Sequence, residues 1–160
     1  MASKEAKTVS ELMTTEVIAF RPEDTIRHVA KTLRTHHISG APVIDDQRIV
    51  VGVISEADIM KLTASVPFPD IDPLNPFPVF SLTAYMSKVK RIPEEITALF
   101  EGLVKDVMTR KPITITPDAS ISDAARIMHK HDFNRIPVVD AEGKLVGVIA
   151  RDDLLSVFAP

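Results

Sequence analysis

Two short stretches of the chain place an aspartate just after an apolar run, where its carboxylate could bind hydroxyl groups. The first is GVISEADIM, residues 52–60, which carries Ser55 and Asp58. The second is GVIARDDLL, residues 147–155, which carries Ala150 and Asp153 at the same positions. A carboxylate can accept charge-assisted hydrogen bonds from two neighbouring sugar hydroxyls, and the start of a helix favours a phosphate. Ser-x-x-Asp is also a helix-capping pattern that needs no ligand.

The change from Ser55 to Ala150 bears on the choice between a ligand and a cap. Alanine has no hydroxyl with which to cap a helix, yet the aspartate is present in both stretches. On the residues alone, this favours a bound group for the aspartates. Capping stays open as the alternative.

The two stretches close two copies of a longer segment, which are related by an offset of 95 residues and align without a gap. Identical pairs include Met13 and Met108, Pro22 and Pro117, His36 and His131, Pro42 and Pro137, Gly52 and Gly147, and Asp58 and Asp153. Self-similarity of this kind indicates an internal duplication.

Both copies predict the same order of elements: a short strand, an amphipathic helix, two buried strands joined by a turn, and a second helix. These are expected at 17–20, 26–33, 41–45, 49–54 and from Ser55 in the first copy, and at 113–115, 121–128, 136–140, 145–149 and from Ala150 in the second. Ser120 and Asp123 form a capping-box pattern at the start of the amphipathic helix of the second copy. The fold class expected is therefore α+β.

The segment between the copies has a different character. Residues 66–80 contain five prolines, which exclude a helix or a central strand and predict an extended connector. One or two helices are expected after it, the second starting near Pro93. The segment is either a spacer or a lid or docking element, because exposed phenylalanines in it would otherwise favour aggregation. The predicted organisation is a first repeat at 1–63, a connector and helical insertion at 64–102, and a second repeat at 103–160.

Composition excludes several classes of function. The formal charge is −3 and the pI about 5.9, so no attraction to nucleic acid or to a membrane surface is expected. The chain has no cysteine, no signal-like or membrane-length apolar run and no glycine-rich phosphate loop, which predicts a cytoplasmic protein that is not an enzyme and has no catalytic residues. No metal site is expected, because His36, His37, His129 and His131 are typical of helix C-termini.

Each copy resembles a CBS domain (named for cystathionine beta-synthase), and the pair resembles a Bateman module, a regulatory nucleotide-sensing unit. The resemblance covers residues 9–62 and 104–158. It rests on MT opening each copy, on a strand, proline and helix after it, on PVID or PVVD, and on GVI followed by the aspartate. It implies two β-α-β-β-α repeats packed sheet to sheet with pseudo-two-fold symmetry and with two clefts between them.

The resemblance further implies which residues line the clefts, since each cleft takes the aspartate end of one copy and the opening strand of the other. Cleft A would combine Ile54, Ser55, Asp58, Thr109, Ile113, Asn134, Arg135 and Ile136. Cleft B, expected to bind more weakly, would combine Thr14, Ile18, Ser39, Gly40, Ala150, Arg151 and Asp153. The aspartates would hold a ribose, Ser55 and Arg135 a phosphate, and the isoleucines of cleft A a base.

The function expected is a regulatory module that binds AMP, ADP, ATP or S-adenosylmethionine as a regulatory ligand, with no obligatory cofactor. The alternative is a structural protein with empty clefts that docks an unidentified protein target through residues 64–102. The resemblance also implies a homodimer formed by the terminal helices. The apolar residues expected to need covering there are Ile59, Met60, Leu62, Leu154, Leu155 and Phe158.

Overall fold

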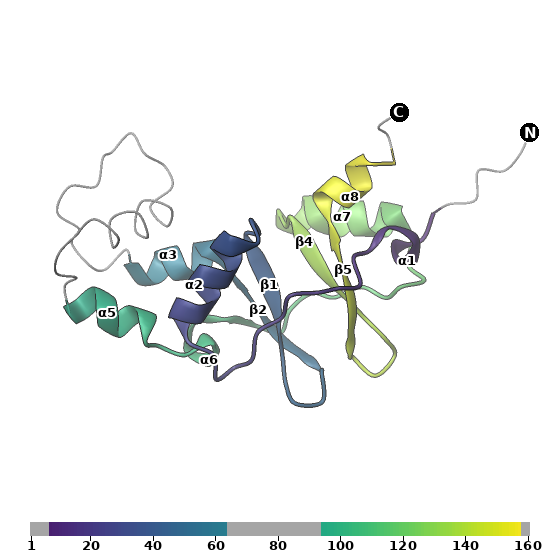
Figure 1. The fold of residues 1–160 in the computed structure, drawn as a ribbon. Helices are drawn as coiled ribbons and strands as arrows, with labels where there is room; N and C mark the ends of the chain where they lie inside the picture. Colours follow the sequence, from purple (N-terminus) through teal and green to yellow (C-terminus); the bar gives the residue numbers. More distant parts are fainter. Residues whose placement is uncertain (1–6, 64–93, 158–160) are drawn as a thin grey trace, which may run out of the picture. The chain divides into compact units, whose positions relative to one another are not determined.

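The structure is a computed structural model that describes residues 7–63 and 94–157 of the 160-residue chain. The proline-rich connector, the helix expected before residue 93 and Phe158 lie outside these residues. The described chain combines helices with two small sheets, which confirms the predicted α+β class (Figure 1). Its described residues form two compact units: unit 1 comprises 7–19, 44–51 and 111–157, and unit 2 comprises 20–43, 52–63 and 94–110.

Unit 2 holds most of the first sequence copy. Its elements are α2 (Ile26–Thr35), β1 (Gly40–Ile44), β2 (Val50–Ser55), α3 (Glu56–Thr63), α5 (Glu94–Phe100), α6 (Val104–Val107) and β3 (Thr109–Arg110), with the tip of the β1–β2 hairpin assigned to unit 1. The sheet order is β1-β2-β3, and β2 and β3 are antiparallel. Figure 1 shows α2, α3 and α5 close together in this unit. The helix expected near Pro93 is confirmed as α5.

Unit 1 holds most of the second copy. Its elements are α1 (Val9–Leu12), α7 (Ile121–His131), β4 (Arg135–Val139), β5 (Leu145–Ala150) and α8 (Arg151–Leu155). Strands β4 and β5 form an antiparallel pair, with Arg135 opposite Ala150 at one end. The core of this unit consists of Val9, Ile115, Ala124, Met128, Ile136, Val138, Ile149 and Leu154.

The expected opening strands at 17–20 and 113–115 do not form, which corrects the sequence interpretation. Each segment makes a single parallel bridge, Phe20 to Val43 and Ile115 to Val138. Beside these bridges the partner strands carry Pro42 and Pro137, which have no N–H to donate and so limit the ladder. The segments are extended, and only their last apolar residue is fixed to a sheet.

The opening residues of each copy pack on the body of the other copy. In unit 1, Val9 N–H donates to Ala119 O at 2.9 Å, and Thr14 and Val148 exchange two backbone hydrogen bonds of 2.9 Å. In unit 2, Val104 N–H donates to Asp24 O at 2.8 Å. Each unit is thus completed by a segment from the other copy, and Figure 1 shows residues 7–19 running from α1 past β5.

Two short helices, α1 and α6, begin these exchanged segments and were not predicted. For α1 the sequence carried a signal, since Thr8 and Glu11 have capping-box spacing. Thr8 N–H donates to Glu11 Oε1 at 3.4 Å, and the Thr8 hydroxyl donates to the same oxygen at 3.3 Å. Helix α6 is preceded by Leu103, whose side chain has no polar atom with which to cap it.

The strand glycines in the two GVI runs allow the exchanged segments to approach closely. A Cβ on Gly147 would lie 2.7 Å from Met13 Sδ and 3.0 Å from Thr14 O. A Cβ on Gly52 would lie 2.8 Å from Met108 Sδ and 2.9 Å from Thr109 O. Because real Cβ contacts are longer than this, each Met-Thr pair requires glycine on the strand that it crosses.

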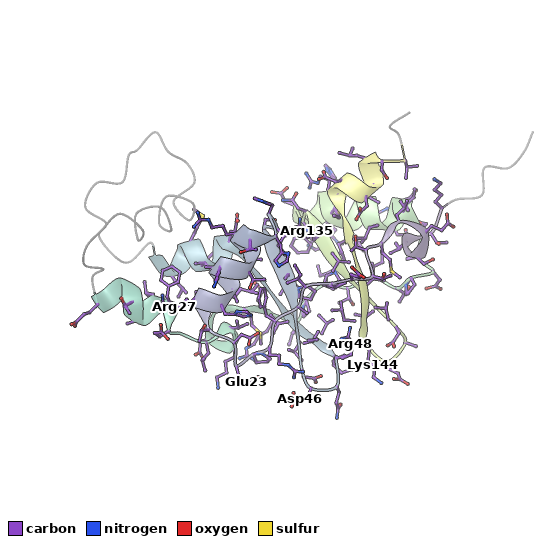
Figure 2. The ribbon with its side chains drawn as sticks, in the orientation of Figure 1. Glu23, Arg27, Asp46, Arg48, Arg135 and Lys144 are labelled. Atoms are coloured by element: carbon purple, nitrogen blue, oxygen red, sulfur yellow. The ribbon has the colours of Figure 1, made fainter. Side chains whose placement is uncertain are left out.

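The aspartates of PVID and PVVD shape the hairpin turns, which form where the sequence predicted them. The carboxylate of Asp45 accepts backbone bonds of 2.8 and 2.9 Å from the second and fourth residues after it, and that of Asp140 accepts equivalent bonds of 2.9 and 3.0 Å. Gly143 has φ +83, and at the equivalent position Arg48 has φ +66. Figure 2 shows Arg48 near Lys144, and Arg48 Nη2 donates to Leu145 O at 3.3 Å.

The predicted apolar dimer face is partly wrong, because two of its residues are buried within their own units. Ile59 is 1% exposed, and Leu154 is 8% exposed in the core of unit 1. Met60 and Leu62 are half-buried. Among the described residues of this predicted face, Leu155 is the one with a large exposed apolar surface, since 59% of it is exposed.

The close approach at Gly147 predicts a cost for any side chain there. Gly147→Ala should destabilise the protein by about 1–3 kcal/mol, because the new methyl group overlaps Met13 and the backbone of Thr14. Urea unfolding measures the effect. In the Met13→Ala background the same change should cost less, and an equal cost in both backgrounds would show that Met13 does not press on the glycine.

The capping box at the start of α7 is confirmed and predicts a pH dependence. The Ser120 hydroxyl donates to Asp123 Oδ2 at 2.9 Å, and this bond is the main cause that holds the pKa of Asp123 below its ordinary value. A lowered pKa in the folded state contributes stability above the unfolded pKa, which is lost as pH falls through the folded pKa. Ser120→Ala should raise the pKa of Asp123 in an NMR titration, whereas Ser122→Ala on the exposed face should leave it unchanged.

Candidate functional site

Both candidate aspartates lie on helices that follow a strand without an intervening loop. Helix α3 begins at Glu56 directly after β2, and α8 begins at Arg151 directly after β5. The first helical N–H is held by the residue before the neighbouring strand: Glu56 N–H donates to Ser39 O at 2.9 Å, and Arg151 N–H to Asn134 O at 2.8 Å. Two predicted site residues, Ser39 and Asn134, therefore position the helix start through their carbonyl groups.

In unit 2, Ser55 and Asp58 form a capping box. The backbone N–H of Ser55 donates to Asp58 Oδ2 at 2.8 Å, and the Ser55 hydroxyl donates to the same oxygen at 3.0 Å. Asp58 N–H lies 3.4 Å from the Ser55 hydroxyl oxygen. Helix capping, the alternative that the sequence left open for Ser55 and Asp58, is therefore the correct interpretation for the Oδ2 atom of Asp58. Among the described residues, Asp58 is the one charged residue that is buried, with 9% of its surface exposed.

In unit 1, Asp153 caps its helix without a serine. Ala150 N–H donates to Asp153 Oδ2 at 2.7 Å. The sequence argument that Asp153 has lost its capping partner is thus wrong, because the partner of the carboxylate is a backbone N–H that any residue except proline supplies. The persistence of the aspartate does not by itself indicate a ligand.

The threonines of the two MT pairs lie beside the helix starts of the other copy. Thr109 is paired with Val53 on β2 in unit 2, and Thr14 is paired with Val148 on β5 in unit 1. Both threonines are exposed. Unit 2 therefore gathers Ser39, Gly40, Ile54, Ser55, Asp58 and Thr109, and unit 1 gathers Thr14, Asn134, Arg135, Ile136, Ala150, Arg151 and Asp153.

The residue differences between the two helix starts occur at paired positions. In unit 2 a Cβ on Gly40 would lie 3.2 Å from Ser55 Cβ, and in unit 1 Arg135 is the direct partner of Ala150. The changes from serine to alanine and from glycine to arginine are therefore neighbours across a strand pair. Packing across the strand pair therefore accounts for the two changes together.

Several predicted site residues have other surroundings in the structure. Ile54 and Ile136 are both 0% exposed, so their side chains pack in the cores of their units. Ile18 and Ile113 are half-buried in extended segments. The guanidinium of Arg151 donates to Phe133 O at 3.1 Å and lies 3.8 Å from Asp132. Clefts A and B each draw residues from both units, and their assembly stays a prediction.

Within the described residues, 7–63 and 94–157, no helix has the length and apolar character needed to cross a membrane. In the same ranges no three His, Cys, Asp or Glu side chains lie close enough together to hold a metal ion.

Comparison with known proteins gives matches along almost the whole chain. The CBS domain family matches residues 9–65 and 104–160. The uncharacterized protein MJ1426 of Methanocaldococcus jannaschii is 35% identical over 150 residues, which cover 92% of this chain and 88% of that protein. The chloroplastic CBS domain-containing protein CBSX2 of Arabidopsis thaliana is 30% identical over 151 residues, which cover 92% of this chain and 62% of that protein.

Among solved structures, the crystal structure of CBSX2 in complex with AMP is similar with a TM-score of 0.69 and 27% identity. The match covers 94% of this chain and 95% of that chain. A second crystal structure, of CBSX2 from Arabidopsis thaliana, is similar with a TM-score of 0.73 and 26% identity, and it covers 96% of this chain and 94% of that chain.

The bond from Ala150 N–H predicts a structural role for Asp153 in the absence of any ligand. Asp153→Ala should destabilise the protein by about 1 kcal/mol, because the first turn of α8 loses its cap. Asp153→Asn should restore most of this, since the amide oxygen can still accept the bond. Thermal unfolding compares both with Asp152→Ala at the exposed neighbouring position, and equal stability of the Asp153→Ala variant and the wild type would contradict the assignment.

Proposed function

Because the chain belongs to the CBS-domain family and carries two copies of the domain, we propose that it is a regulatory module that binds an adenine nucleotide or a related adenosyl compound without converting it. The observation that carries the proposal is the geometry of the Asp58 carboxylate. Its Oδ2 atom accepts two hydrogen bonds from Ser55, which hold the group in place, and its Oδ1 atom is available to a ligand. CBSX2, whose structure with AMP is similar to this chain, supports the class of ligand.

The second oxygen of Asp58, Oδ1, accepts no hydrogen bond from any described residue. Among those residues, no buried side-chain oxygen or nitrogen lacks a partner. Oδ1 must therefore be accessible, although the residue as a whole is 9% exposed. An accessible carboxylate oxygen in a largely buried setting is suited to a ribose hydroxyl, because a charge-assisted hydrogen bond is stronger where water is scarce.

Further parts of the proposal concern the two clefts. Cleft A unites Asp58, Ser55 and Thr109 with Arg135, and it is the stronger phosphate site because it holds both the serine and the arginine. Cleft B unites Asp153 and Arg151 with Thr14 and binds more weakly. We also propose that the chain is organised as repeats at 1–63 and 103–160 and that the protein is cytoplasmic. A homodimer is proposed as well, and the exposed side chain of Leu155 supports it.

A second candidate is a protein that docks a partner through residues 64–102. The observation that favours it is the length of this segment between two regions that match the family at 9–65 and 104–160. Of this segment, residues 94–102 are described, and Glu101 there pairs with Arg27 of α2 at 2.8 Å. The two functions are compatible, because a ligand that binds two conformations unequally shifts their populations.

Calorimetry of the full chain against AMP, ADP, ATP, S-adenosylmethionine and NADH tests the proposal. We expect one tight adenosyl ligand per chain, with any second binding event weaker. Asp58→Ala should lose about 1.5–3 kcal/mol of binding free energy, the usual contribution of a hydrogen bond to a charged group.

The matched control is Lys130→Ala, a change to an exposed charged residue of α7 that should leave the affinity unchanged. Far-UV circular dichroism of both variants checks that the fold is retained. Wild-type affinity in the Asp58→Ala variant, or no binding of any of these compounds to the wild type, would overturn the proposed function.

A further inference from the structure

Residues 7–14, the arm, are hydrogen-bonded to the second copy of the repeat and not to the first. The backbone N–H groups of Val9 and Ser10 donate at 2.9 Å to carbonyl groups in the segment before α7, and Thr14 exchanges two bonds of 2.9 Å with Val148. Among the described residues, no hydrogen bond joins the arm to the rest of the first copy. The arm is therefore attached to unit 1 as one piece.

Residues 15–19, the hinge, connect the arm to Phe20, where unit 2 begins. No hydrogen bond joins the hinge to any residue that the structure describes. Thr15 and Glu16 are exposed, and the other hinge residues are half-buried. The backbone of the hinge can therefore change direction without breaking a hydrogen bond.

The arm carries its own apolar contacts with unit 1. Val9 is 0% exposed in the core of this unit, and Leu12 and Met13 pack against that core. Met13 also lies against Gly147, where no Cβ would fit. A second copy of the chain presents the same core and the same strand glycine. Its unit 1 therefore fits this arm as well as it fits its own.

The corresponding segment of the second copy, residues 104–110, is held more broadly. Helix α5 precedes it and packs on α2 and α3, and Phe100 at the end of α5 is 3% exposed. Glu101 pairs with Arg27 of α2 at 2.8 Å. Release of that segment would require α5 to leave the unit as well, so the arm is the segment better suited to exchange between chains.

We propose that the arm of one chain docks on unit 1 of a second copy, with residues 15–19 as the hinge. The contacts of the arm are the same in the closed and the exchanged forms, so the hinge and the chain concentration determine which form is populated. Because Thr14 is a predicted residue of cleft B, each candidate cleft in the exchanged dimer would combine Asp153 of one chain with Thr14 of the other. Only this last step rests on the proposed function.

The chain has no cysteine, so an engineered disulfide can report the exchange. Thr14 and Val148 form a hydrogen-bonded antiparallel pair, whose Cα atoms are typically about 5.5 Å apart, within reach of a disulfide. A chain with Thr14→Cys is mixed with a mass-tagged chain with Val148→Cys, and the mixed disulfide is followed on non-reducing gels. The control pairs Thr14→Cys with Lys130→Cys, an exposed position on α7. A dimer formed through Leu155 does not require these two positions to meet.

The length of the hinge sets the expected rates. With an effective concentration of about 1 mM for a short connection, roughly one chain in ten should be exchanged at a chain concentration of about 100 μM. Deletion of Thr15 and Glu16 shortens the extended hinge by about 7 Å and should raise the initial rate of the mixed disulfide about tenfold, because the closed form is strained. Thr15→Ala combined with Glu16→Ala keeps the length and should behave as the wild-type hinge.

Hydrogen exchange of the unmodified protein is a second measurement that needs no variant. The amides of Val9, Ser10 and Thr14 should exchange at one common opening free energy, below that of Met128 in the middle of α7, because the arm opens as a unit. Protection of the arm equal to that of Met128 would show that it leaves only when unit 1 unfolds, which contradicts the proposal.

The disulfide experiment decides between exchange and a fixed arm. A mixed disulfide that forms faster than in the control, and faster still after the deletion, supports exchange. A rate equal to that of the control, with and without the deletion, would overturn it. Neither measurement contains a ligand, so failure of the exchange leaves the proposed function intact, and failure of nucleotide binding leaves the exchange intact.

Discussion

The contact between a methionine-threonine pair and a strand glycine determines how the rest of the molecule is assembled. Met13 lies against Gly147, and Met108 lies against Gly52, each at a distance that leaves no room for a Cβ. The threonine that follows pairs with the same strand. These contacts bring the opening of one copy to the aspartate end of the other, so the residues that define a candidate site come from distant parts of the sequence.

The exchange also explains why the compact units do not follow the order of the sequence. The chain passes between units after residues 19, 43, 51 and 110. Each unit buries apolar residues from an exchanged segment: Val9 and Val104 are both 0% exposed. Neither unit can therefore complete its core from a continuous stretch of the chain, and the loss of either exchanged segment leaves a cavity where a valine was packed.

Much of the fold could be predicted because its signals are local. Apolar spacing predicted α2 and α7, a capping box added support for α7, and continuous apolar runs predicted β1, β2, β4 and β5. The opening strands were expected from short apolar runs, but their pairing depends on the backbone N–H groups of the neighbouring strand, and proline has none to donate. Helix α6 has no capping side chain and only four residues, so its stability comes from tertiary packing that no local pattern records.

The candidate site shows the same division between local and non-local information. The sequence identified Ser55 and Asp58, and the structure brings them together with Thr109 and with the Ser39 carbonyl. It misjudged Asp153, since a side-chain pattern does not show which backbone N–H groups need a partner. Gly40 and Ser55, which stand where the second copy has Arg135 and Ala150, are neighbours across β1 and β2, and this contact is visible only in the structure.

The reciprocal exchange has a consequence for the origin of the chain. A single copy, on its own, would have an opening segment without a strand to cross and a strand glycine without a methionine to cover it. Two separate identical chains could satisfy both needs only by trading their opening segments, as in domain swapping. Joining the copies in one polypeptide replaces that encounter between molecules with an intramolecular one at high effective concentration. Gene duplication and fusion would in this way join two chains that trade segments into one polypeptide, after which the two helix starts were free to diverge.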